Sequence, residues 1–140
     1  MTPLKRLPKK EHRPLTDVEL ELMTILWRIK EGSVHDVIEQ LAKDRSLAYT
    51  SVSTILRILE QKQVIESRKE GRGHIYYPIV SKTEYEASSV KRLVETVFDG
   101  APTAMVKQLL NSSNLTQSDL KELKHFLNTK LENEENTRSR

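Results

Sequence analysis

The 140-residue sequence contains no cysteine, only four glycines and five prolines, and few aromatic side chains: one Trp, four Tyr and two Phe. The absence of cysteine excludes disulfides, cysteine-ligated zinc or iron–sulfur centres and thiol nucleophiles. Apolar runs are short and the basic N-terminus is followed by no apolar stretch, so we expect neither a membrane span nor a secretion signal. With 36% hydrophobic and 31% charged residues, the composition predicts a cytoplasmic, mainly helical protein with no membrane partner.

Signatures of catalysis and of cofactor binding are missing as well. The sequence has no Gly-rich phosphate loop, no G-x-S-x-G and no HExxH motif. Its four histidines lack the spacing of paired metal ligands; they are His12, His35, His74 and His125. We therefore expect no enzymatic activity, no metal and no cofactor.

The net charge of +3 results from the cancellation of segregated charges. Residues 1–14 carry five basic residues and one acidic (+4), whereas residues 15–44 carry three basic and seven acidic (−4). Residues 45–78 carry six basic and three acidic (+3), and residues 79–140 carry nine of each. A surface that binds phosphates is therefore expected to form from the first and third of these segments.

Capping signals divide the first half of the chain into helices. A basic, proline-containing segment at 1–14 is typical of a disordered arm. Thr16 with Glu19 three residues later forms a capping box that begins a first helix, and Ser33 is placed to cap a second. Thr50 is placed to cap a third helix over 50–62, whose apolar face comprises Val52, Ile55, Leu56 and Leu59.

The other face of this third helix carries small hydroxyl side chains followed by one cation. Ser and Thr are mediocre helix formers, and an ordinary solvated face is richer in Glu, Lys and Gln. Small donors leave room for another surface to approach, which favours a binding face, although a merely solvated surface is the alternative. The residues at i, i+3, i+4 and i+7 are Thr50, Ser53, Thr54 and Arg57.

The period changes to that of strands after the third helix. Residues 64–79 contain two β-prone stretches joined by a turn with Gly71 and Gly73, which predicts a hairpin with Arg72 at its tip. Three short helices followed by a hairpin are the order of a winged helix-turn-helix, predicted here over 15–80. The predicted DNA-binding residues are Tyr49, Thr50, Ser51, Ser53, Thr54, Arg57, Lys62, Arg68, Lys69, Arg72 and His74.

Residues 81–131 predict further amphipathic helices, beginning with a capping box at Ser81 and Glu84. Their apolar stripes are too extensive for short helices to hide among themselves, so we expect a helical dimerisation domain, followed by a disordered tail at 132–140. An intramolecular core is the alternative for these stripes. The predicted dimerisation residues are Val90, Leu93, Val94, Val97, Leu109, Leu120, Leu123 and Leu127.

Three stretches of the sequence form a recognisable pattern: LTDVELELMTILW from Leu15, AYTSVSTILRILEQKQVI from Ala48, and the GRGHIYYPIV hairpin from Gly71. Together they resemble the BlaI/MecI/CopY family of bacterial transcriptional repressors. The resemblance covers about residues 14 to 125 and implies homodimers that bind palindromic operators through an N-terminal winged helix and associate through C-terminal helices. We thus expect a repressor whose recognition helix (50–62) enters the major groove while its wing (64–79) contacts the backbone or minor groove. A winged-helix module that binds protein instead of DNA is the alternative.

The sequence departs from the family pattern at four places. The family's Arg in the recognition helix falls at Ile58 here. The family's glycine after the recognition helix is Gln63 here, so we expect this turn to find its left-handed residue elsewhere or to close differently. The Asn-Phe pair cut in the β-lactam-responsive members corresponds to Gln108-Leu109. The cysteine cluster of the copper-responsive members is absent. An upstream sensor or protease is thus left unidentified, and the operator, the target genes and the inducing signal do not follow from the sequence.

Overall fold

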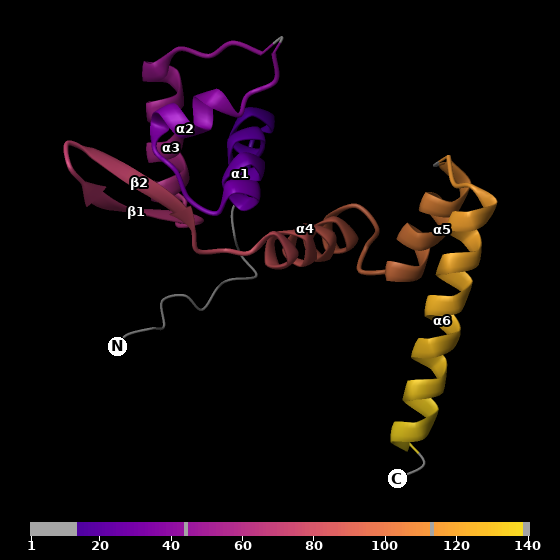
Figure 1. The fold of residues 1–140 in the computed structure, drawn as a ribbon. Helices are drawn as coiled ribbons and strands as arrows, with labels where there is room; N and C mark the ends of the chain where they lie inside the picture. Colours follow the sequence, from indigo (N-terminus) through magenta and orange to yellow (C-terminus); the bar gives the residue numbers. More distant parts are fainter. Residues whose placement is uncertain (1–13, 44, 113, 139–140) are drawn as a thin grey trace. The chain divides into compact units, whose positions relative to one another are not determined.

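The computed structural model describes residues 14–43, 45–112 and 114–138, which form six helices and one antiparallel hairpin (Figure 1). The chain divides into two compact units, Met1–Leu93 and Val94–Arg140. The predicted mainly helical fold with a small hairpin wing is confirmed. The elements are α1 (Asp17–Ile29), α2 (Val34–Glu39), α3 (Tyr49–Gln61), β1 (Ile65–Glu70), β2 (Gly73–Pro78), α4 (Lys82–Thr96), α5 (Pro102–Ser112) and α6 (Gln117–Arg138).

The predicted N-caps of α1 and α2 are both present. The backbone N–H of Glu19 donates to Thr16 Oγ1 (3.2 Å), and the Thr16 N–H donates back to Glu19 Oε1 (3.0 Å). Ser33 forms the same reciprocal pair with Asp36, at 3.1 and 2.9 Å. These side chains satisfy backbone donors that a helix start leaves without intrahelical partners, which sets where α1 and α2 begin.

The start of α3 differs from the prediction by two residues. Ala48 occupies the N-cap position with extended dihedral angles (φ −69°, ψ 153°) and makes no side-chain cap. Thr50, expected as the cap, lies inside the helix and is exposed. Its hydroxyl is therefore displayed on the helix surface instead of being used to close the helix end.

The hairpin pairs Ile65 with Pro78 at one end and Glu70 with Gly73 at the other. Gly71 has φ +62°, a conformation that a two-residue hairpin turn requires and that glycine adopts without steric cost. Gly32 adds a short bridge to this hairpin through two hydrogen bonds with the Tyr76 backbone, of 3.0 and 2.8 Å. A Cβ at Gly32 would lie 2.9 Å from Asp36 Cβ, so the close approach favours glycine here.

Gln63 itself adopts the left-handed conformation (φ 64°), so the expectation that this turn would use another residue is wrong. The following segment is drawn into the core, since Val64 and Ile65 are both fully buried. Burial of these two side chains outweighs the cost of about 1–2 kcal/mol for an L-residue with positive φ.

One hydrophobic core holds the N-terminal unit together. Val52, Leu56 and Leu59 of α3 are fully buried in it, as the predicted apolar face requires, while Ile55 is only partly buried. The hairpin packs against the end of α3 (Figure 1). The buried hydrophobic residues are Leu22, Met23, Ile25, Leu26, Val34, Val37, Val52, Leu56, Leu59, Val64, Ile65, Tyr76 and Val80.

The helices of the second unit, in contrast, bury no side chain among their described residues. The tail predicted to be disordered from residue 132 is helical through Arg138, so that prediction is wrong for 132–138. Lys130, Glu134 and Arg138 alternate in charge at four-residue intervals, a spacing that stabilises an exposed helix. Residues 139–140, and residues 1–13 of the predicted arm, lie outside the described residues.

Candidate nucleic-acid interface

The outward face of α3 consists of the predicted hydroxyl side chains. Thr50, Ser51 and Thr54 are exposed and Ser53 is partly exposed. Together with Ile55, the three exposed residues line an open concavity of about 360 Å³. Sequence periodicity assigned Ile55 to the buried face; that it is only partly buried became apparent in the structure. Hydroxyls beside an aliphatic side chain can form hydrogen bonds with base edges and contact the methyl group of thymine.

Tyr49 and Arg57 flank this face at its two ends. Tyr49, the first residue of α3, has an exposed fraction of 49%, and its ring lies 5.0 Å from that of His35 at an angle of 48°. Arg57 is exposed. His35 joins the surface from α2, and no spacing in the sequence pointed to it.

Half of the cations in the 45–78 segment are paired with carboxylates of the acidic segment before it. Arg45 Nε lies 3.1 Å from Glu21 Oε1. Lys62 Nζ lies 2.6 Å from Glu19 Oε1, and Arg68 Nη2 lies 2.8 Å from Glu31 Oε2. The two segments with opposite charge thus neutralise each other in part. Within the described part of the chain, the cations of this segment without an ion pair are Arg57, Lys69 and Arg72.

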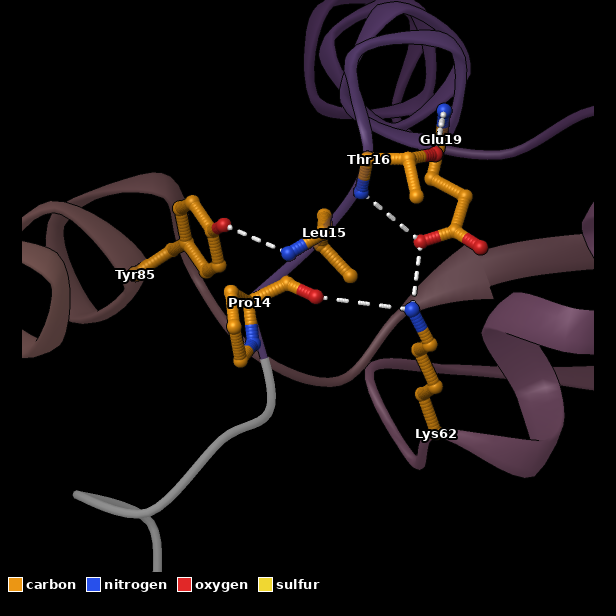
Figure 2. A network of polar contacts seen from close by, with 6 residues as sticks. All are labelled: Pro14, Leu15, Thr16, Glu19, Lys62 and Tyr85. Atoms are coloured by element: carbon orange, nitrogen blue, oxygen red, sulfur yellow. Dashed lines mark hydrogen bonds and ion pairs between the residues drawn. The ribbon is translucent and has the colours of Figure 1, made fainter.

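Lys62, predicted to contact DNA, is instead held inside the N-terminal unit (Figure 2). Its side chain is 15% exposed and that of Glu19 is 9% exposed. Burial raises the pKa of Glu19, but hydrogen bonds from Lys62 and the Thr16 backbone, with the Lys62 charge, outweigh it and leave the pKa below its ordinary value. Lys62 Nζ also donates to the Pro14 carbonyl oxygen at 3.4 Å. The ammonium group is therefore occupied by protein acceptors.

Arg68, also predicted to contact DNA, forms a bidentate ion pair with Glu31. Its Nη1 and Nη2 donate to the two carboxylate oxygens at 2.9 and 2.8 Å, and Nε donates to Glu70 at 3.4 Å. The hydrogen bond from Arg68 lowers the pKa of Glu31, and the same bond raises the pKa of Arg68. Because both side chains are nearly half exposed, the pair adds little stability. It does orient the guanidinium toward the protein.

The other wing residues predicted to bind DNA are gathered at the tip of the hairpin. Lys69 and His74 are direct cross-strand partners, and Arg72 lies in the turn. All three are exposed. A cationic hairpin tip of this kind can reach a phosphate or a narrow minor groove.

The predicted dimerisation residues are exposed in the single chain, apart from the partly exposed Val94. Exposed fractions range from 42% at Leu93 to 61% at Val97. Four further large hydrophobic residues have similar exposure and lie at helical spacing from the predicted ones; three of them belong to the apolar stripes of the sequence, and only Phe126 was missed. These are Val106, Leu110, Phe126 and Leu131.

Over 14–43, 45–112 and 114–138, no group of three His, Asp or Glu side chains is placed to hold a metal ion. No described helix combines the length and the apolar character needed to span a bilayer.

Three helices, of which the third displays hydroxyl side chains, followed by a hairpin with a cationic tip, define a winged-helix DNA-binding protein. The penicillinase repressor family matches residues 15–129, and the chain belongs to this family. This membership confirms the resemblance noted in the sequence and the prediction of a DNA-binding repressor that is not an enzyme.

Similar proteins include regulators of antibiotic resistance. The methicillin resistance regulatory protein MecI of Mammaliicoccus sciuri is 25% identical over 116 residues, which cover 83% of this chain and 94% of that protein. The penicillinase repressor of Bacillus licheniformis is 25% identical over 124 residues, covering 89% and 93%. Among solved structures, the DNA-binding domain of the repressor BlaI is 28% identical with a TM-score of 0.47, and the match covers 54% of this chain and 92% of that domain.

Proposed function

We propose that the protein is a homodimeric transcriptional repressor that binds a palindromic operator. In this proposal α3 enters the major groove, and the β1–β2 hairpin lies on the backbone or in the minor groove. The observation that carries it is the hydroxyl face of α3 around the open concavity, on a chain that belongs to the penicillinase repressor family. Occupying an operator in this way blocks access to a promoter.

The roles within the DNA-binding surface divide by chemistry. Thr50, Ser51 and Thr54 carry short side chains that allow the α3 backbone to approach base edges closely. Arg57 is long enough to reach a guanine or a phosphate from the same face. Lys69 and Arg72 supply the sequence-independent attraction to phosphates from the wing. Lys62 and Arg68 are left out of this set because carboxylates already occupy them.

The exposed apolar residues of α5 and α6 support a homodimer. Neither helix buries a described side chain, although Leu120, Leu123 and Leu127 recur at helical spacing along α6. Such a stripe is unfavourable in water unless another apolar surface covers it. A second copy related by a two-fold axis offers the same stripe, and two-fold symmetry of the protein matches palindromic symmetry of the operator.

The DNA-binding proposal is tested by selecting duplexes from a randomised pool with the full-length protein. Affinity for the selected duplex is then measured by fluorescence anisotropy at salt concentrations between about 50 and 200 mM. Arg57, Lys69 and Arg72, the described cations of residues 45–78 without an ion pair, amount to six per dimer; if each releases about 0.9 counterion, the slope of log affinity against log salt should be about −5 or steeper. Absence of any salt-sensitive binding would favour the alternative of a protein-binding module.

The dimer is tested separately by sedimentation equilibrium. Leu123→Lys introduces a charge on the apolar stripe of α6 and should weaken association at least about tenfold, because an apolar contact is replaced by a buried charge. Glu122→Lys, at the adjacent exposed position, is the matched control and should associate nearly like the wild type. A wild-type protein that is monomeric at micromolar concentration, with and without DNA, would contradict the homodimer.

A further inference from the structure

Two aromatic side chains attach residues 80–85, at the N-terminal end of α4, to α1 and to the segment before it. Trp27 of α1 donates its indole N–H to the carbonyl oxygen of Val80 at 2.9 Å, just before α4 begins. Tyr85, in the first turns of α4, accepts a hydrogen bond at its hydroxyl oxygen from the Leu15 backbone N–H at 3.2 Å. The rings of Trp27 and Tyr85 are 5.9 Å apart. Together these contacts hold the beginning of α4 against Trp27 in the last turn of α1 and against the segment that precedes α1.

The backbone segment Pro14–Thr16, to which Tyr85 is hydrogen-bonded through Leu15, is also held by α3. Figure 2 shows Tyr85 and Lys62 approaching the Pro14–Thr16 segment from opposite sides. Lys62, the C-cap of α3, donates to the Pro14 carbonyl and to Glu19, whose carboxylate in turn accepts from the Thr16 N–H. The C-terminal end of α3 and the first turns of α4 are therefore both fixed to one three-residue segment.

Burial decreases quickly along α4 beyond this attachment. Tyr85 packs against the core of the N-terminal unit and Ser88 is buried, whereas Val90 and Leu93 are 47% and 42% exposed. The direction in which α4 leaves the N-terminal unit is thus set mainly by its first turns. Ile79 and Val80 are held by hydrogen bonds to Val64 and Trp27, so without the contacts of Tyr85 helix α4 would be free to rotate about the backbone dihedral angles at Ser81.

In the proposed homodimer, on which this inference rests, α4 joins the recognition helix of each protomer to the helices that associate. The distance between the two recognition helices then depends on the angle between α3 and α4, which is set at the N-terminal end of α4. Dimeric helix-turn-helix proteins read half-sites whose spacing matches the separation of their recognition helices. A fixed angle makes one spacing favourable, while a loose angle lets several spacings bind.

We propose that Tyr85 is a positioning residue that sets the half-site spacing which the repressor accepts. It touches no DNA in this proposal. It acts by holding α4 in a fixed orientation relative to α3, through the Pro14–Thr16 segment. Loss of this contact should leave recognition of a single half-site intact and should relax the choice of spacer.

The experiment uses the full-length protein and duplexes built from the selected operator. One duplex carries a single half-site, one carries both half-sites at the selected spacing, and others have the spacer shortened or lengthened by about two base pairs. The variants are Tyr85→Ala, which removes the ring and hydroxyl, and Tyr85→Phe, which removes only the hydroxyl. Glu86→Gln is the matched control, because Glu86 is the next residue of α4 and forms its ion pair with Lys82 on the same helix.

We expect the wild type and Glu86→Gln to prefer the selected spacing by about tenfold, a typical coupling between linked sites. Tyr85→Ala should keep its half-site affinity within about twofold while its spacing preference falls to about twofold, with Tyr85→Phe in between. A Tyr85→Ala protein that retains the full preference would overturn the proposal. So would equal losses on half-site and full operator, because they would indicate damage to the recognition unit itself. Failure of the wild type to bind any selected duplex would refute the proposed function as a whole.

Discussion

Removing the ammonium group of Lys62 should destabilise the N-terminal unit by about 3 kcal/mol. The Lys62→Met variant keeps most of the aliphatic stem but leaves the Glu19 carboxylate, whose side chain is 9% exposed, without its counter-charge. Breaking a buried pair by removing one partner costs about 3–5 kcal/mol. The remaining hydrogen bond from the Thr16 N–H and the 15% exposure of Lys62 place the expected cost at the lower end of that range.

The assay is urea unfolding followed by the fluorescence of Trp27. Trp27 is the only tryptophan in the chain and lies on α1, so its signal reports the N-terminal unit. With a denaturant dependence of about 1.5 kcal/mol per molar, the midpoint should fall by about 2 M. Lys82→Met is the control: it removes a lysine from an ion pair whose side chains are both 58% exposed, and it should change stability by less than about 0.5 kcal/mol.

The destabilisation should also depend on pH in a definite direction. Because the pKa of Glu19 in the folded protein lies below its ordinary value of 4.5, ionised Glu19 stabilises the fold above pH 4.5, and this contribution is lost as the pH falls through the lowered pKa. In Lys62→Met, burial without the counter-charge raises that pKa. The deficit of the variant should therefore be full at pH 7 and shrink at acidic pH. A loss of unfolding free energy below about 1 kcal/mol at pH 7, or a loss that is as large at acidic pH as at pH 7, would refute this account of the Lys62–Glu19 pair.

Three further predictions concern the DNA surface and the turn before the wing. Arg57→Ala should weaken operator binding by about 1–3 kcal/mol and relax base preference at one position, as measured by anisotropy on single-base operator variants; an equal loss on all sequences would identify a phosphate contact instead. Arg72→Ala should make the slope of log affinity against log salt shallower by about 0.9 per protomer, whereas Arg68→Ala should change it less, since Glu31 already pairs with Arg68. Gln63→Gly should raise stability by about 0.5 kcal/mol in the Trp27 assay because glycine relieves the positive φ, while Gln61→Gly on α3 should lower it; a Gln63→Gly protein less stable than wild type would contradict the strain at that turn.

Local sequence signals were sufficient to predict most of the helices and strands. Thr16 and Ser33 begin their helices as predicted, because a capping box is a contact between residues three apart and needs no tertiary partner. The hairpin is likewise predicted by its own alternation and by Gly71 in the turn. Local reasoning was wrong at Gln63, where burial of the residues that follow dictates a backbone conformation that glutamine alone would avoid.

The sequence was sufficient to name the residues of the DNA-binding surface. It did not show which of their side chains are free of partners within the protein. The spacing of Thr50, Ser53, Thr54 and Arg57 was enough to place them on one face of a helix, because a helix repeats every 3.6 residues. No periodicity could reveal that Lys62 meets Glu19, since 43 positions separate them and only the packing of α3 against α1 brings them together.

The sequence by itself therefore determined the order of elements, the hydroxyl face of α3 and the absence of thiol chemistry, because these depend on residue identity and on contacts within a few positions. Only the tertiary structure decided which cations are free. Packing brings the acidic segment beside the basic one, so Glu19, Glu21 and Glu31 neutralise half of the six cations of residues 45–78. Electrostatic attraction acts through space and not along the chain, and for that reason the surface left for phosphate became visible only in the folded protein.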